Sequence, residues 1–451
     1  MSKVKYKSYK SSKTLWLDKI PEHWQETDLR MLFADNKEKN IGLVEKNLLS
    51  LSYGKLKRKD IDNTTGLVPA SFEGYQIIGE GYIVLRFTDL QNDKKSLRVG
   101  YANERGIITS AYIGLAPKIG LNSKYYYYLL HFLDKFKYYY NLGGGVRQSL
   151  SYKDFGRETI LVPDEPEQTT IAKFLDYKTE KINRFIKKKK QLIKLLNEQK
   201  AAIINQAVTK GLDPNVPMKD SGIEWLGEIP EHWEVKKLKF ATNLLRGKFT
   251  PRPRNDPKYY DGKYPFIQTG NLTSTSKYIE TYNQTLNELG RDVSKEFPIN
   301  TVVMSVAANI ADVAILNFKA CFPDSVIGFY PFKETDTDFL FYQLKNLRAE
   351  FYKIAIKSTQ YNLNVDRVKN VKIFLPKLPE QKAIVSHIET ETQTIDKTID
   401  TIQKEITLVE EYKTALIAEA VTGKIDVRDF KLPKEETPLA MVAEGAAHYN
   451  K

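Results

Sequence analysis

The chain has 451 residues and a mass of 51.9 kDa, enough for about two to four domains. Hydrophobic residues make up 41% and charged residues 28% of it, which excludes general disorder. Lysine and arginine (69) exceed aspartate and glutamate (56), and the formal net charge of +13 favours a polyanionic partner. The single cysteine, Cys321, excludes an intrachain disulfide and a cysteine-based zinc site.

The sequence contains no apolar run near the roughly 18 residues that a membrane-spanning helix needs. Residues 1–13 are basic and polar and do not resemble the apolar segment of a signal peptide. We therefore expect a cytoplasmic protein that has no membrane partner.

The chain is internally duplicated. The segment WLDKIPEHW begins at Trp16 and returns as WLGEIPEHW from Trp225, an offset of 209 residues. The segment PDEPEQ begins at Pro163 and returns as PKLPEQ from Pro376, and this offset of 213 also relates later matches that end in Ala-Val-Thr. The order is thus variable, constant, variable, constant. The constant blocks are expected to have a common role, such as holding partners, and the variable blocks to recognise different targets. The alternative is simple duplication followed by sequence drift, in which the variable parts are only loops and core.

Each constant block is predicted to form one long helix. In the second block apolar residues recur every seven positions, at Ile388, Ile395, Ile402, Val409 and Leu416, with Ile399 and Ile406 between them. The equivalent seam of the first block holds Leu175, Ile182, Leu196 and Ile203, with Ile186 and Ile193 beside it, and is broken by Lys189. Pro166 and Pro379 suit a first helical turn, and Gly211 and Gly423 mark the ends.

A helix of about 43 residues is roughly 65 Å long, and its single apolar seam needs a partner. Residues 167–211 contain 11 basic and 4 acidic side chains, whereas residues 380–424 contain 5 basic and 9 acidic ones. These opposite charges favour pairing between the two helices over self-pairing. We expect antiparallel pairing, with a pseudo-two-fold axis and the variable domains at opposite ends of a rod. Because residues 212–233 resemble residues 3–24, the end of the second helix should lie beside the N-terminus.

The two variable segments, residues 25–160 and 234–375, are predicted to form mixed α/β domains because they are rich in Tyr, Phe, Val, Ile and turn residues. Strands are predicted at 81–86 and 301–306, and short helices at 125–133 and 339–347.

Basic and amide side chains cluster in four predicted loops of these domains, residues 53–59, 143–149, 246–254 and 357–362. Lysine and arginine neutralise phosphates, and arginine, glutamine and asparagine pair with base edges. Any single such residue is more often a solvated surface side chain, but the clusters together favour DNA contact. The candidate DNA-binding residues are Lys55, Lys57, Arg58, Lys59, Arg86, Arg147, Gln148, Lys153, Arg246, Lys248, Arg252, Arg254, Gln268, Asn271, Lys357, Gln360 and Asn362.

The sequence shows no catalytic or metal-binding pattern. The five histidines lack the HExxH and HxH spacings of metal sites, and no GxxxxGK[ST] phosphate loop is present. His23 and His232 lie in the repeated blocks, where a packing role is expected. Residues 255–259 (NDPKY) only loosely match the adenine-methyltransferase motif and are predicted to form a turn. The composition favours a DNA reader that has no catalytic activity.

Taken in order, these blocks resemble the specificity subunit of Type I restriction–modification enzymes. The marks are IPEHW before each variable domain, PEQ before each long helix and Ala-Val-Thr followed by Gly at each helix end. The resemblance covers about residues 12–428, and its specificity comes from the duplicated order of motifs that are weak singly. The second variable domain adds YPFIQTGNL from Tyr264, but residues 308–311 (ANIA) depart from the common Gly-x-Ile-Gly.

The resemblance implies an α+β fold, in which two mixed α/β target recognition domains are separated by two long antiparallel coiled-coil helices, with a pseudo-two-fold internal repeat. The corresponding boundaries are 1–163 for the first recognition domain, 164–211 for the first helix, 212–375 for the second recognition domain, 376–424 for the second helix and 425–451 for a C-terminal tail. The tail has no counterpart in the first half, and we expect it to be mobile from Asp429.

The resemblance also implies a division of labour. Each recognition domain would read one half of a bipartite duplex DNA site, and the paired helices would set the spacer and dock two methyltransferase subunits. Restriction/translocase subunits would join them, and the system would serve antiviral defence. S-adenosylmethionine is expected in the methyltransferase subunit, and ATP and magnesium in the restriction subunit. This chain would hold no cofactor and no metal, and would direct adenine methylation and restriction without catalysing either.

Two other classes stay open from the residues alone. A stand-alone DNA-binding regulator or architectural protein built on a coiled coil would bind DNA well without partners. An enzyme with a hidden active site is the third class. A specificity subunit should instead copurify with two methyltransferase subunits.

Overall fold

The computed structural model describes residues 4–62, 71–90, 97–142, 149–223, 226–307, 309–357 and 361–433. The chain forms two compact units: the first unit is residues 1–189 with 404–451, and the second unit is residues 190–403. Each unit contains one mixed α/β domain and part of both long helices. Within the described ranges, no helix combines the length and the apolar character that crossing a membrane requires.

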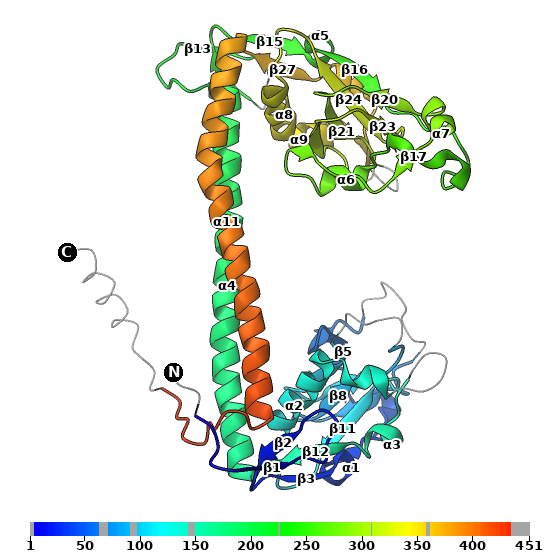
Figure 1. The fold of residues 1–451 in the computed structure, drawn as a ribbon, viewed down its shortest axis with the longest axis vertical. Coiled ribbons are helices and arrows are strands. Elements are labelled where there is room, and N and C mark those ends of the chain that lie inside the picture. Colours follow the sequence, from blue (N-terminus) through cyan, green and yellow to red (C-terminus); the bar gives the residue numbers. More distant parts are fainter. Residues whose placement is uncertain are drawn as a thin grey trace, which may run out of the picture. The chain divides into compact units, whose positions relative to one another are not determined.

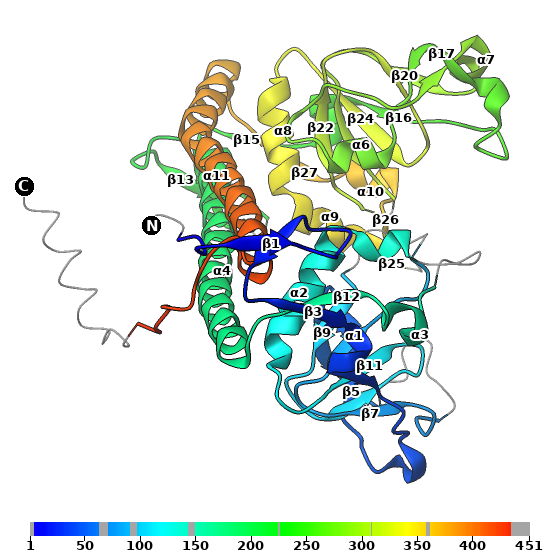
Figure 2. The same ribbon diagram turned by 60° about the horizontal axis from the view of Figure 1, so that its bottom comes forward.

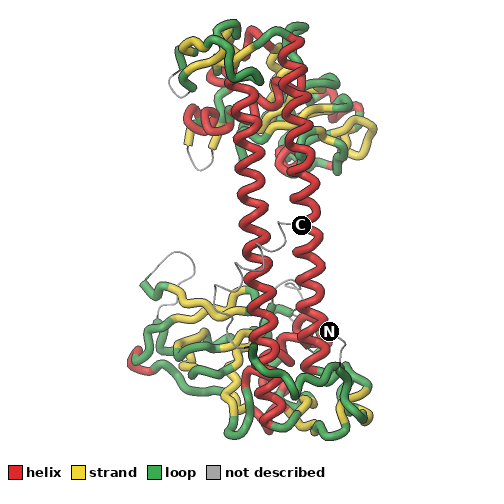
Figure 3. Tube along the Cα trace, turned by 90° about the vertical axis from the view of Figure 1, so that its left-hand side faces the viewer, coloured by secondary structure: helices red, strands yellow, loops and turns green. Residues whose placement is uncertain are grey.

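The two long helices lie side by side and run antiparallel (Figure 1 and Figure 3). Helix α4 spans Glu165–Lys210 and α11 spans Leu378–Val421. In the first unit, Lys413 Nζ of α11 donates a hydrogen bond to Asn183 Oδ1 of α4 at 2.8 Å. In the second unit, Lys200 Nζ of α4 lies 2.6 Å from Asp396 Oδ2 of α11. The predicted pair of long antiparallel coiled-coil helices is confirmed.

The predicted heptad positions form the seam between these helices. On α11 the buried members are Ile388, Ile395, Ile399, Ile402, Ile406 and Leu416. On α4, Leu175 and Ile186 are buried, and Ile182, Ile193, Leu196 and Ile203 are half-buried. Lys189, which interrupts the apolar pattern, has its Nζ 2.7 Å from Glu405 Oε2 of α11. The break in the seam is therefore matched by an opposite charge, as the charge difference between the helices predicts.

The domain of the first unit, called the first domain, contains two four-stranded sheets in the orders β6-β5-β10-β7 and β4-β11-β8-β9, and a pair β12–β3. A hairpin, β1 (Tyr9–Ser11) with β2 (Lys19–Pro21), precedes it. The other strands are β3 (Gln25–Asp28), β4 (Phe33–Asp35), β5 (Leu48–Ser52), β6 (Lys55–Lys59), β7 (Gln76–Ile78), β8 (Ile83–Leu85), β9 (Val99–Tyr101), β10 (Gly106–Ile108), β11 (Ile113–Pro117) and β12 (Thr159–Val162). The helices are α1 (Leu29–Leu32), α2 (Ser123–Lys135) and α3 (Tyr152–Phe155).

The domain of the second unit, called the second domain, is built on a five-stranded sheet in the order β16-β24-β21-β22-β18, with the strand pairs β15–β27, β17–β19, β20–β23 and β25–β26. A hairpin of β13 (Met218–Asp220) and β14 (Glu228–Pro230) precedes it. The strands are β15 (Glu234–Lys237), β16 (Thr242–Arg246), β17 (Tyr260–Pro265), β18 (Tyr278–Ile279), β19 (Thr285–Leu286), β20 (Lys295–Phe297), β21 (Val302–Ser305), β22 (Val313–Leu316), β23 (Ala320–Phe322), β24 (Val326–Pro331), β25 (Ile356–Lys357), β26 (Tyr361–Asn362) and β27 (Lys372–Leu375). The helices are α5 (Leu238–Ala241), α6 (Thr269–Thr273), α7 (Glu288–Asp292), α8 (Thr337–Asn346), α9 (Arg348–Ile354) and α10 (Val365–Lys369).

The duplication is visible in the strand registers. Tyr9 lies opposite Pro21 in β1–β2, and Met218 lies opposite Pro230 in β13–β14, so that both positions are shifted by 209. The pairs β3–β12 and β15–β27 match in the same way. In each unit one hydrophobic core joins the α/β domain to the ends of α4 and α11. The internal repeat is therefore a repeat of structure.

Most predicted elements of the domains are found, but two of the predicted loops are partly wrong, one of them because Lys357 and Tyr361–Asn362 belong to the strand pair β25–β26. The predicted strands correspond to β8 and β21, and the predicted short helices to α2 and α8. Residues 55–59 were expected in a loop, but they form β6, which pairs with β5 through five residue pairs. Strand β6 lies at the edge of its sheet, where a run of lysine side chains can remain in water.

The repeated IPEHW segment of the first unit packs where α4 begins and α11 ends. Glu167 Oε1 accepts a hydrogen bond from Tyr6 OH at 2.5 Å, and Glu167 Oε2 lies 2.7 Å from His23 Nε2. Trp24 is fully buried, and an added Cβ on Gly423, just after α11, would lie 3.3 Å from its ring. The packing role expected for His23 is confirmed, and the Glu167 carboxylate is its hydrogen-bond partner.

The second unit repeats this joint with exchanged helix ends. Glu380 Oε2 lies 2.9 Å from His232 Nε2, and Glu380 Oε1 accepts a hydrogen bond from Trp233 Nε1 at 2.9 Å. Gly211, which follows α4, has a positive φ of 75° and stands against Trp233. In each unit one helix start and the other helix end are thus held by the same motif.

The glutamine of each PEQ motif connects a long helix to the α/β domain of the same unit. Gln168 Oε1 accepts a hydrogen bond from Asn122 N at 2.9 Å, and Gln381 Oε1 accepts one from Asp336 N at 2.7 Å. Asn122 and Asp336 are the N-cap residues of α2 and α8. The Glu-Gln pair therefore orients each domain on the helix that follows it.

The first described residues of the chain, including β1, lie beside the end of α11, as the repeat predicts (Figure 2). Tyr9 OH donates a hydrogen bond to Gly423 O at 3.1 Å, and Asp426 N donates one to Val4 O at 2.8 Å. The tail continues along α4, where the rings of Phe430 and Phe174 are 5.1 Å apart. Residues 434–451 lie outside the described part of the chain, and the expected mobility of the tail from Asp429 stays a prediction.

Candidate nucleic-acid interface

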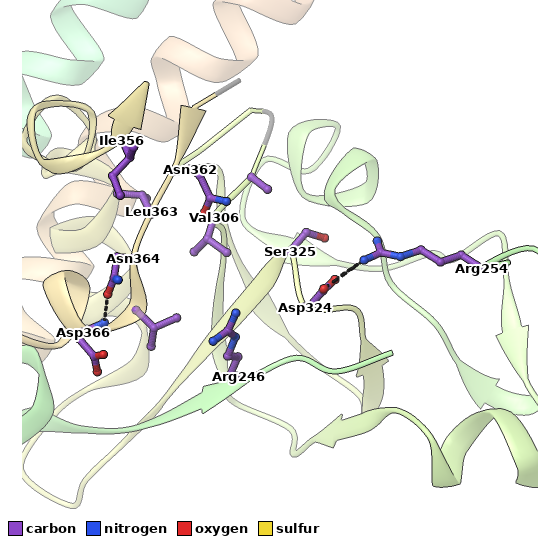
Figure 4. Close-up of a pocket in the computed structure, with 12 residues that line it drawn as sticks. Arg246, Arg254, Val306, Asp324, Ser325, Ile356, Asn362, Leu363, Asn364 and Asp366 are labelled. Atoms are coloured by element: carbon purple, nitrogen blue, oxygen red, sulfur yellow. Dashed lines mark hydrogen bonds and ion pairs between the residues drawn. The ribbon is translucent and has the colours of Figure 1, made fainter. Parts of the chain in front are cut away.

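Three adjoining hollows, together called the second-domain cleft, lie at the end of β16. The largest has a volume of about 540 Å³ and is lined from three sides, by Arg246, by residues 324–325 with Arg254, and by residues 362–366 (Figure 4). The second, about 440 Å³, shares Arg246 and Asp324 with it, and the third, about 370 Å³, shares Arg254 and Ser325. The shared residues make these hollows one continuous surface.

Gly247 brings the basic strand end to the wall of this cleft. Gly247 N donates to Val326 O and Lys248 N donates to Phe322 O, both at 2.9 Å. A Cβ on Gly247 would lie 1.9 Å from Pro323 O. Only glycine permits this approach without a backbone shift, and the approach sets the side chains on either side of it, at 246 and 248, along the cleft.

Gly247→Ala is expected to displace this wall and to reduce affinity for duplex DNA by about tenfold or more. The added methyl group must push backbone atoms apart, which should cost about 1–3 kcal/mol of unfolding free energy. Calorimetry and duplex titration measure both effects. Gly270→Ala is the matched control, because nothing lies within 4 Å of a Cβ at that position. Equal behaviour of the two variants would contradict the role of Gly247.

Of the residues predicted in the second domain, six line the second-domain cleft. They are Arg246, Arg254 and Asn362 in the largest hollow, Lys248 and Arg252 in the second, and Gln268 in the third. The structure therefore gathers at one surface residues that lie more than a hundred positions apart in the sequence.

Three other predicted residues of this domain have different placements. Asn271 is half-buried, and its Oδ1 accepts a hydrogen bond from Gln268 N at 3.0 Å, so that its side chain helps to cap α6. Lys357 is exposed on β25, next to Ile356, which lines the largest hollow. Gln360 lies outside the described residues.

The first domain has an equivalent cleft of about 510 Å³, called the first-domain cleft. It is lined chiefly by three segments, residues 35–39, 110–113 and 150–153. Shifted by 209, 214 and 213 positions, these segments fall on the residues that line the second-domain cleft. The paired strands β4–β11 and β16–β24 share the same register under these shifts. The two domains therefore carry the same cleft.

This equivalence identifies two lysines that the sequence patterns missed. Lys37 occupies the position of Arg246, and Lys39 occupies the position of Lys248. The 209-residue offset of the IPEHW block was the available signal. It was hidden because the two segments, ADNKEKN and NLLRGKF, have diverged.

The residues predicted in the first domain are only partly at its cleft. Lys153 lines it. The lysines of β6, Lys55, Lys57 and Lys59, are exposed on the edge strand instead. Arg86 is half-buried, and its carbonyl oxygen accepts a hydrogen bond from Arg98 Nη1 at 3.1 Å. The predicted residues Arg147 and Gln148 lie outside the described part of the chain.

Arg58 of β6 is held by Glu104. Its Nε donates to Glu104 Oε1 at 2.8 Å, and this hydrogen bond is the main cause that lowers the pKa of the Glu104 carboxyl. The same partner raises the pKa of the Arg58 guanidinium. Both groups stay charged at neutral pH, so a phosphate near β6 would meet three exposed lysines and one arginine that is already paired.

The comparisons with known proteins show to which family the chain belongs. Residues 80–195 and 230–410 match the family described as "Type I restriction modification DNA specificity domain". The chain belongs to this family. It is a specificity subunit that recognises DNA, and the two matched ranges cover the second half of the first recognition domain, most of the second and most of both long helices.

Two curated relatives come from Methanocaldococcus jannaschii. The Type I restriction enzyme MjaVIII specificity subunit is 27% identical over 348 residues, which are 73% of this chain and 76% of the relative. The putative type I restriction enzyme MjaX specificity subunit is 26% identical over 431 residues, covering 91% and 96%.

The fold also matches a solved structure described as "Structural basis underlying complex assembly and conformational transition of the type I R-M system". The TM-score is 0.66 at 15% identity, and the match covers 90% of this chain and 99% of that one. At this identity the likeness supports the fold of the specificity subunit and no further detail.

Proposed function

We propose that this specificity subunit reads a split duplex DNA site, one half with each cleft, and that its paired helices set the unread spacer. The observation that carries the proposal is the repetition of one cleft with different side chains. Ser110 in the first-domain cleft corresponds to Asp324, and Lys153 corresponds to Asp366. A shared scaffold with unlike linings is what two readers of unlike sequences need.

The side chains divide naturally between phosphates and bases. Exposed lysines on β6 and around Lys248 suit the phosphate backbone, which supplies salt-dependent affinity. Arg246, Arg254 and Asn362 surround the largest hollow, where arginine matches guanine and asparagine matches adenine.

The chain is proposed to act within an assembly in the cytoplasm. Two methyltransferase subunits that hold S-adenosylmethionine would dock along the helices, and restriction/translocase subunits that use ATP and magnesium would join them. Apolar side chains left exposed on the helices, at Phe185, Leu192, Leu195 and Leu408, support docking there. The chain would choose the sequence for methylation and for restriction, as an antiviral defence, and catalyse neither.

Paired charge-removal variants in the two clefts are expected to change one half-site each. Lys37→Ala with Lys39→Ala should relax or weaken recognition of one half, and Arg246→Ala with Lys248→Ala should do so for the other half. A lost bidentate base contact costs about 1–3 kcal/mol of discrimination, roughly tenfold to a hundredfold. Genome-wide mapping of methylated adenines made by each assembled complex measures this.

Lys319→Ala is the control, since Lys319 is exposed on the turn between β22 and β23 and is absent from the linings of the two clefts described above. It should leave the whole recognised sequence unchanged. If both paired variants altered both half-sites equally, or neither, the assignment of one half-site to each cleft would be refuted.

A further inference from the structure

The carboxylate of Asp324 lies in the second-domain cleft. A negative charge is unexpected there, because it repels the phosphates of DNA. Arg254 Nη2 donates to Asp324 Oδ1 at 2.8 Å and to Oδ2 at 3.1 Å. The Asp324 side chain remains 43% exposed, and that of Arg254 48% exposed. Figure 4 shows the pair on one wall of the largest hollow, with Arg246 near it.

The position of Asp324 is fixed by the backbone. It follows Pro323, whose carbonyl oxygen is the atom that excludes a side chain at position 247. Strand β23 ends two residues earlier, and β24 begins two residues later. Asp324 thus sits on a tight turn between buried strands and cannot move far from the cleft.

The charges of the largest hollow differ from those of its neighbour. In the largest hollow two arginines, Arg246 and Arg254, face two carboxylates, Asp324 and the exposed Asp366 on the opposite wall. The second hollow is lined by Arg246 and Asp324 and also by Lys248 and Arg252, so basic side chains outnumber acidic ones there. A phosphate entering the largest hollow would meet like charge and would have to displace Asp324 from Arg254. A base edge would not meet this repulsion, because it carries no net charge. Its amino groups can also donate hydrogen bonds to a carboxylate.

We propose that Asp324 is a specificity-determining residue, which withholds Arg254 from phosphates and so reserves the largest hollow for base edges. The inference rests on the proposed function, because it assumes that this cleft meets DNA. It predicts two opposite effects of the carboxylate. Asp324 lowers the affinity for DNA of any sequence, and it raises the ratio of specific to random affinity.

The first-domain cleft supports this assignment by contrast. The equivalent positions there are Ser110 and Lys153, neither of which is acidic. The carboxylate of the first-domain cleft is instead Asp35, which pairs with Lys37, so a carboxylate that holds the counterpart of Arg254 is not repeated at position 110. The effect of Asp324 should therefore be confined to the half-site that the second domain reads.

Asp324→Asn in the full-length chain, assembled with its methyltransferase subunits, tests the proposal. The probes are a random-sequence duplex and a duplex that carries the site mapped for the parent complex. The variant should bind the random duplex about threefold to tenfold more tightly, because Arg254 becomes available to one phosphate. The plot of log affinity against log salt should steepen by about 0.9 for that phosphate. The ratio of specific to random affinity should fall, and only one half-site should relax.

Two further variants control for the change of charge and for the role of Arg254. Glu334→Gln makes the same charge change at an 83% exposed side chain on the second domain and should leave the ratio unchanged. In an Arg254→Ala background, Asp324→Asn should give no gain on the random duplex. A simple loss of structure would weaken both probes, so a gain on one of them cannot come from misfolding.

The inference is overturned if Asp324→Asn fails to tighten binding to the random duplex, or if the gain persists without Arg254. Failure of the proposed function looks different. In that case Arg254→Ala and Arg246→Ala would leave binding of the mapped site unchanged, which removes the cleft from DNA recognition altogether.

Discussion

Glu167→Ala is expected to cause a large loss of stability at the helix joint of the first unit. The Glu167 side chain is 1% exposed, and its two oxygens hold Tyr6 and His23. Removing it leaves a buried hydroxyl and an imidazole without their partner, which should cost about 3 kcal/mol. For a unit of this size that corresponds to a fall of roughly 6–12 °C in the unfolding midpoint. Differential scanning calorimetry of the full-length chain measures it.

The second unit supplies a matched comparison. Glu380 makes the equivalent contact to His232 and a different one to Trp233 Nε1, and its side chain is 29% exposed, so Glu380→Ala should cost about half as much. Glu165→Ala, at an exposed position in the first turn of α4, should cost less than about 1 kcal/mol. Equal midpoints for the variants at 165 and 167 would show that the joint does not depend on the buried carboxylate.

Lengthening both long helices by four residues is expected to move recognition to a longer spacer while both half-sites stay unchanged. Insertions after Lys189 in α4 and after Gln403 in α11 fall close to one level of the pair, since Lys189 contacts Glu405. Four residues add about 6 Å and turn a helix by about 40° beyond a full turn. One base pair adds 3.4 Å and about 34°, so a spacer longer by one or two base pairs should restore the fit. A four-residue insertion is also the kind of stutter that a coiled coil tolerates.

Mapping of methylated adenines gives the new spacer directly. The same four residues inserted after Asp213, in the exposed loop that follows α4, should leave the spacer as it was. An unchanged site in the double-insertion variant would remove the paired helices as the ruler. Loss of all methylation together with a lowered unfolding midpoint would mean that the seam, and with it the helix pair, had failed.

The sequence by itself determined the duplicated plan, the two long helices and their preference for each other. These features are local or periodic: a seven-residue apolar repeat is written along one segment, and the opposite charges of α4 and α11 can be counted without knowing the fold. The seam break at Lys189 could be seen in the sequence, but its partner Glu405 lies more than two hundred residues away and emerged only with the helix pair in place. The motifs IPEHW and PEQ could be recognised in the sequence, whereas only the structure shows that they join the ends of the two long helices.

Only the tertiary structure decided which side chains share a cleft. Arg246, Asp324 and Asn362 come from three strand ends and turns that long-range sheet pairing brings together. The loop assignment of residues 55–59 failed for a related reason, because an edge strand draws its hydrogen bonds from a neighbour and places few demands on its side chains. Lys37 and Lys39 became visible once strand register aligned the two domains. Pairing between distant strands depends on backbone hydrogen bonds and packing that no local pattern of residues records. For that reason the residues that line the two clefts could be identified only from the tertiary structure.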